Sequence, residues 1–157
     1  MKNDIEPLEP NLWFNRIEKL LDRSSSFESE DPGALVRQAM HVAQLTPRPL
    51  RDTVRFSSEE VTIEEMLECG AFLSAMAALL SPPVTYTLTR RGVGKYVAAV
   101  SCPDSRCRGQ GESNSAEKAL LTGWCQFLLD LKRQSQFAFN QSLHISQSAQ
   151  HQQLTEH

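Results

Sequence analysis

The sequence has no apolar run long enough to cross a membrane, because no stretch approaches the roughly 18 consecutive apolar residues that a span needs. Residues 1–9 are polar and acidic and lack the basic start and apolar run of a secretory signal. These absences predict a soluble protein of the cytoplasm or the nucleus, with no membrane partner. At 157 residues and 40% hydrophobic content, the chain can bury one adequate core.

Cysteine is scarce, and its spacing is not that of a metal site. The four cysteines lie within or beside apolar segments and form no Cys-x2-Cys pair. This placement is typical of reduced, buried thiols, not of a disulfide framework. The sequence also lacks a complete phosphate-binding loop and any nucleophile placed beside a base. We therefore expect no enzyme activity, no cofactor and no metal.

Charge is distributed unevenly along the chain. Residues 1–83 carry 8 Lys and Arg against 14 Asp and Glu, whereas residues 84–134 carry 8 against 4. A basic module on an acidic body indicates either a site for a polyanion or two halves that attract one another.

Helical periodicity dominates the first half of the sequence. Apolar residues recur at helical spacing over 12–21, and a second helix is predicted between the Asp31 cap and Pro47. Thr62 opens a Thr-x-x-Glu capping box, which predicts one long helix over residues 62–80 that ends at the following prolines.

After these prolines the apolar period changes towards two. The alternation over 85–89 and 96–102, separated by Gly92 and Gly94, predicts an antiparallel hairpin. A short third strand is predicted over 106–109, and Asn114 is expected to cap a last helix that runs to about residue 131.

The last helix has more apolar residues than one face needs. Leu121, Trp124, Cys125 and Leu129 lie off its main stripe, so a second layer must cover them. That layer is either the N-terminal helices, which we favour, or another copy of the chain in a homodimer.

These elements predict an α+β fold: N-terminal helices, a three-stranded antiparallel sheet and a C-terminal helix packed between the two. We divide the chain into a helical region over 1–57, an α-β-β-β-α domain over 58–134 and a polar tail over 135–157. The tail is rich in Gln, Ser and His, and it is predicted to be mostly disordered.

The domain over 58–134 resembles a double-stranded-RNA-binding domain (dsRBD). The residues that carry the resemblance are Pro83, Tyr86, Gly92, Tyr96-x-x-x-Val100-x-Cys102 and Gly109-x-Gly111-x-Ser113, in which the last group is expected to form a turn before an Ala- and Leu-rich helix. The resemblance implies that duplex RNA contacts the loop at 90–95 and the helix start at 113–118. Where the family has adjacent lysines, this chain has Asn114 and Ser115, which removes two phosphate contacts.

A second resemblance uses part of the same sequence. Residues 94–100, Pro103-Asp104 and Ser115-x-Glu117-x-Ala119-Leu120 are similar to antitoxins of the HicB type, whose sheet and helix block an RNA-cleaving toxin. The strand order is shared by other small proteins and is not a functional signature.

The leading hypothesis is therefore a non-enzymatic module that binds nucleic acid, with duplex RNA as its partner. The alternative is a regulator that binds a protein partner: an antitoxin, an inhibitor of a host factor or a dimerising dsRBD-like domain. The candidate nucleic-acid contacts are Arg90, Arg91, Lys95, Arg106, Arg108, Ser113 and Lys118, and the candidate protein contacts are Trp124, Phe137 and Phe139.

Overall fold

The computed structural model describes the chain over residues 6–26, 31–54 and 59–155. Within these residues, four helices, with a short 3-10 helix between the second and third, precede a three-stranded sheet, and a fifth helix follows it. These elements are α1 (Pro10–Ser25), α2 (Pro32–Gln44), η1 (Arg48–Leu50), α3 (Glu60–Glu68), α4 (Phe72–Ala78), β1 (Thr85–Arg90), β2 (Tyr96–Ser101), β3 (Arg108–Ser113) and α5 (Ala116–Thr155). The α+β class and the antiparallel hairpin predicted from the sequence are confirmed.

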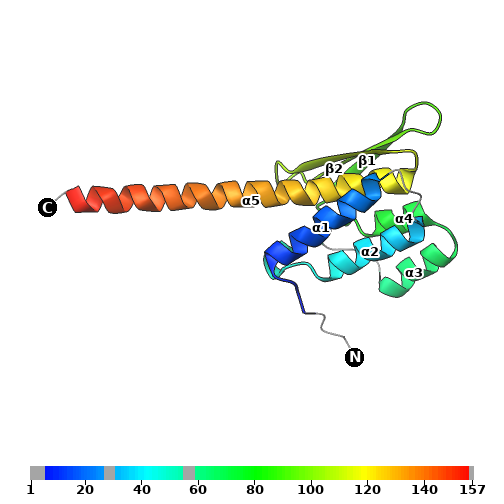
Figure 1. Cartoon of the computed structure of the whole chain (residues 1–157), viewed down its shortest axis with the longest axis horizontal. Coiled ribbons are helices and arrows are strands. Elements are labelled where there is room, and N and C mark those ends of the chain that lie inside the picture. The colour runs from blue at the N-terminus through cyan, green and yellow to red at the C-terminus, as the bar shows by residue number, and fades with distance from the viewer. Residues whose placement is uncertain (1–5, 27–30, 55–58, 156–157) are drawn as a thin grey trace.

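The elements form three layers, with α5 in the middle (Figure 1). One side of α5 packs against β2 and β3, and α1, α2 and α4 contact α5 as well. The second layer predicted from the surplus apolar residues is therefore supplied within the chain. Leu121, Trp124 and Cys125 are all buried as a result.

All of these layers share one hydrophobic core. Trp13 of α1 is fully buried, and its indole N–H donates to the carbonyl oxygen of Val42 in α2 at 2.8 Å. The hydroxyls of Ser24 and Thr122 form a buried hydrogen bond of 3.1 Å that joins α1 to α5. The core contains residues from every layer, among them Trp13, Leu35, Met40, Ile63, Met76, Val100, Leu120, Trp124 and Phe127.

The prediction of one helix over 62–80 is wrong, because the chain breaks at Gly70. Gly70 has a φ of +74°, which ends α3 in a left-handed cap that a residue with a side chain rarely adopts. The N–H groups of Gly70 and Ala71 donate back to the carbonyls of Leu67 and Met66, as in a Schellman motif. Thr62 lies inside α3, which begins at Glu60, so the predicted capping box does not form.

The third strand is longer and later than predicted, and the Gly-x-Gly-x-Ser segment lies in it, not in a turn. A Cβ atom on Gly111 would overlap the Ala119 carbonyl oxygen and the Gly123 nitrogen, and one on Gly109 would overlap Gly123 and Phe127. These glycines therefore allow the backbones of β3 and α5 to touch. The two glycines are required because β3 and α5 pack closely. Interpreting them only as turn residues does not predict this role.

The last helix begins and ends differently from its prediction. Ser115, not Asn114, caps it, because the Ser115 hydroxyl accepts from the Lys118 N–H at 3.3 Å. The backbone of 135–155, part of the tail predicted to be disordered, continues as helix to Thr155 and projects beyond the other layers (Figure 1). A helix satisfies its own backbone hydrogen bonds, and residues 135–155 contain no glycine or proline to interrupt it.

Candidate nucleic-acid interface

The β1–β2 hairpin projects from the body (Figure 1). Three of the predicted contacts, Arg90, Arg91 and Lys95, lie on it. The Arg91 N–H donates to the Lys95 carbonyl at 2.8 Å, which closes a loop of Gly92, Val93 and Gly94. Both glycines have positive φ, at +67° and +73°, so the tight turn depends on them. Val93 at the tip is 97% exposed.

The start of α5 lies at the same end of the sheet as this hairpin. Tyr96, the first residue of β2, pairs with Ser113, the last residue of β3. The chain then enters α5 at Ala116, after the Ser115 cap. The two segments that the dsRBD resemblance assigns to RNA contact, 90–95 and 113–118, are thus neighbours in space.

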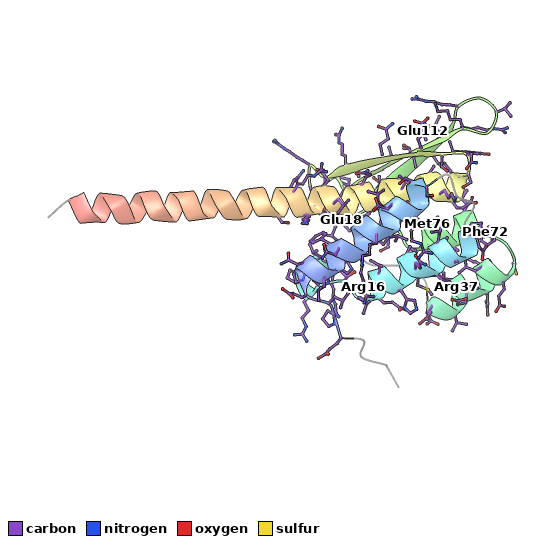
Figure 2. The ribbon with its side chains drawn as sticks, viewed as in Figure 1. Arg16, Glu18, Arg37, Phe72, Met76 and Glu112 are labelled. Atoms are coloured by element: carbon purple, nitrogen blue, oxygen red, sulfur yellow. The ribbon has the colours of Figure 1, made fainter. Side chains whose placement is uncertain are left out.

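Four cations lie at this hairpin end, and they differ in availability. Arg90 and Arg91 are exposed, whereas Lys118 is half-buried at the first turn of α5. Lys95 forms an ion pair with Glu112 of β3 across the end of the sheet. An exposed pair of this kind contributes little to stability, so an incoming phosphate can compete for Lys95. Figure 2 labels Glu112 beside the hairpin.

Arg106 and Arg108 do not join this group. Arg108 pairs with Ser101, so it lies at the opposite end of β2, a strand length of about 17 Å from the hairpin. Its backbone N–H donates to the Asp130 carboxylate of α5 at 2.9 Å.

Ser113, in contrast, lies at the hairpin end. It is half-buried, and its hydroxyl donates to the Asn114 side-chain oxygen. The structure therefore brings together five of the seven predicted contacts and separates the two arginines from them.

Trp124, one of the three predicted protein contacts, is buried in the core. Trp124 is only 2% exposed, because the N-terminal helices and the sheet enclose α5 on its two sides, so a partner cannot reach it in this fold. Phe137 and Phe139 lie on the helical backbone of α5, but their side chains fall outside the described residues.

A second basic surface was not found from the sequence. A groove of about 580 Å³ runs between α1 and α2, and we call it the basic groove. Its lining includes Arg16, Lys19, Arg23 and His41 but no carboxylate, above an apolar floor of Leu20, Val42 and Leu45. Arg16 and Glu112 lie on opposite sides of the body in Figure 2, so the groove and the hairpin end are separate. The sequence signal for this groove is the i, i+3, i+7 spacing of Arg16, Lys19 and Arg23, which places them on one face of a helix. The net negative charge of residues 1–83 hid this signal.

Three of the four cysteines, Cys102, Cys107 and Cys125, are buried in the core. Burial raises the pKa of the Cys125 thiol far above its ordinary value. Burial also raises the pKa of Cys107; a hydrogen bond with Ser105 opposes this rise, and the charges of Asp130 and Cys102 add to it. All four cysteines are free, and only Cys69 is exposed. Among the described residues, no three His, Cys, Asp or Glu side chains are grouped to hold a metal ion.

Comparisons with protein-family models, with curated proteins and with solved structures find no match to this chain. In the part of the chain that the structure describes, no helix combines the length and apolar character of a membrane span. The geometry of the hairpin end and the sequence resemblance are therefore the two indications of function.

Proposed function

We propose that this protein is a non-enzymatic module that binds duplex RNA through the hairpin end of its sheet. Arg90, Arg91 and Lys95 provide phosphate contacts from the hairpin, and Lys118 with Ser113 provides contacts from the start of α5. The body of the domain supports these two segments and does not itself read the RNA.

One observation carries this proposal: the cationic hairpin and the start of α5 lie side by side at one end of a sheet. The hairpin is short, closed by the Arg91–Lys95 backbone pair, and its cations are exposed. The N-terminus of α5 adds the positive end of a helix dipole to the same surface. Duplex RNA is recognised mostly by shape and by backbone contacts, which two neighbouring segments of this kind can make.

The expected affinity is modest for two structural reasons. Asn114 and Ser115 stand where the resembled family has lysines, and Lys95 must leave Glu112 to contact a phosphate. Each phosphate contact contributes through the release of condensed counterions, so three or four contacts give salt-sensitive binding.

The proposal is tested by fluorescence anisotropy with a labelled RNA duplex of about 20 base pairs, slightly longer than the ~16 that such domains span. We expect saturable binding that weakens about 40- to 150-fold between about 50 and 200 mM salt, as three or four released counterions require. Duplex DNA and single-stranded RNA of equal length serve as competitors and should bind more weakly.

Absence of binding at the lower salt would contradict the proposal. The fold would then serve protein recognition, the alternative favoured by the Lys95–Glu112 pair that neutralises one hairpin cation. Equal affinity for all three nucleic acids would also contradict it, because it would indicate attraction by charge alone.

A further inference from the structure

Strand β1 forms an open edge of the sheet. The strand order is β1-β2-β3, and among the described elements β1 packs mainly on β2. Every residue of β1 is exposed except Leu88, which is half-buried against the core. The Arg91–Lys95 hydrogen bond fixes the alternation of the ladder, so Tyr86, Leu88 and Arg90 direct their backbone groups away from β2.

This edge lacks the features that usually prevent strand pairing. Exposed edges are commonly blocked by proline, lysine, a bulge or a covering element. From Thr85 to Thr89, β1 has no proline or charge, and its register with β2 is continuous, without a bulge. The edge at β3 differs, because the Asp130 carboxylate accepts from the Arg108 N–H and the strand carries charged side chains.

The sequence of β1 is complementary to itself in the antiparallel direction. When two copies pair about Leu88, Tyr86 lies opposite Arg90 and Thr87 lies opposite Thr89. Tyr86, Leu88 and Arg90 all turn their backbone groups outward, so the three resulting pairs can form up to about six interchain hydrogen bonds.

The side chains also match in this register. Tyr86 is 41% exposed, and its ring receives the Arg90 guanidinium of the other copy in a cation–π contact. Threonine pairs on the outer face and a leucine pair on the inner face are favourable cross-strand neighbours. The two neighbouring registers are less favourable. A pairing centred on Arg90 would place the two copies of Arg90 opposite one another, and a pairing centred on Tyr86 would place Pro82, which has no N–H, opposite Arg90.

We propose that two copies of this chain pair through their β1 strands, antiparallel about Leu88, to form one continuous six-stranded sheet. The two-fold axis is perpendicular to the sheet, so both α5 helices lie on one face, and the two hairpins point to opposite ends. This pairing is argued from the strand edge and is tested without RNA; Arg90 is the one residue that it shares with the proposed RNA contacts.

Cysteine cross-linking tests the register. In a Cys69→Ser background, which removes the exposed native thiol, Leu88→Cys should form an interchain disulfide because hydrogen-bonded partners have Cα atoms about 5.5 Å apart. Thr85→Cys is the matched control on the same strand, since position 85 of one copy would lie about 20 Å from position 85 of the other. We expect Leu88→Cys to cross-link about tenfold faster or more. A mixture of Tyr86→Cys and Arg90→Cys should cross-link, whereas neither variant should do so alone.

The unmodified chain provides a second test that does not depend on a substitution at a half-buried residue. Sedimentation over about a hundredfold range of concentration should show a monomer–dimer equilibrium. Amide hydrogen exchange at Tyr86, Leu88 and Arg90 should slow as the dimer forms. A monomer at every concentration, or equal cross-linking at positions 85 and 88, would overturn the proposal.

Discussion

Replacing Gly111 with alanine is expected to lower the free energy of unfolding by about 3 kcal/mol, at the upper end of the usual cost of overpacking. The added methyl group would overlap the Ala119 carbonyl oxygen and the Gly123 nitrogen, and it would lie 2.9 Å from the Thr122 Cβ. Two of these atoms are helix backbone, so no side chain can rotate away. The strand and the helix must separate instead, which opens the interface between β3 and α5.

Urea denaturation followed by circular dichroism measures this effect against two controls. Gln110→Ala lies between the two glycines on the exposed face and should change the free energy of unfolding by less than about 0.5 kcal/mol. Gly123→Ala should fall between the two, because its Cβ would lie 3.3 Å from the Val100 side chain, which can shift. A stable Gly111→Ala protein would contradict the close approach of β3 and α5.

Replacing Trp13 with alanine is expected to cost about 4 kcal/mol, the typical penalty for truncating a buried tryptophan. Trp13 is 0% exposed, its indole N–H donates to Val42, and its ring meets Phe14 edge-on with centroids 5.0 Å apart. Alanine removes the ring and the hydrogen bond together and leaves a cavity between α1 and α2. The loss is a large share of the 5–15 kcal/mol that holds a typical domain together.

Two neighbouring substitutions separate packing from chemistry. Trp13→Phe keeps an aromatic ring and loses the hydrogen bond, so its cost should be about 1–2 kcal/mol. Leu12→Ala alters the adjacent residue, which is 53% exposed, and should have an effect below about 0.5 kcal/mol. The same urea titration measures all three variants. Similar stabilities for Trp13→Ala and Leu12→Ala would contradict a shared core of N-terminal helices and α5.

The sequence was sufficient for the elements that have regular apolar periodicity. The helices after Pro10 and Asp31, the hairpin at Gly92 and Gly94 and the second layer over α5 were all predicted from the spacing of apolar residues. These elements fold as local patterns suggest, because burial and turn chemistry favour the same structure at each position.

Two of the errors, the unbroken helix over 62–80 and the turn at Gly109 and Gly111, occurred at glycines. Gly70 fits a helix interior as a small residue, and only its left-handed backbone shows that it ends α3. Gly109 and Gly111 fit a turn, and only the contact with α5 shows why a strand contains them. A glycine has no side chain that could contribute to an apolar pattern. Its role at these positions can therefore be assigned only from the folded structure.

The candidate site was predictable only where its residues are close in sequence. The hairpin cations follow one another in sequence, so their proximity is local, whereas the distance between Arg108 and the hairpin depends on the register of β3. The basic groove joins residues of two helices, and its charge is masked by the many carboxylates in the same half of the chain.

The most direct test of the proposed function compares two charge-matched variants in duplex RNA binding. Arg91→Ala/Lys95→Ala removes two cations from the hairpin, and Arg16→Ala/Lys19→Ala removes two from the basic groove. At about 0.1 M salt each phosphate contact is worth about eightfold in affinity, so the hairpin variant should bind about 60-fold more weakly. The groove variant should bind as the unmodified chain does. Equal losses, or a loss confined to the groove variant, would contradict an interface at the hairpin end.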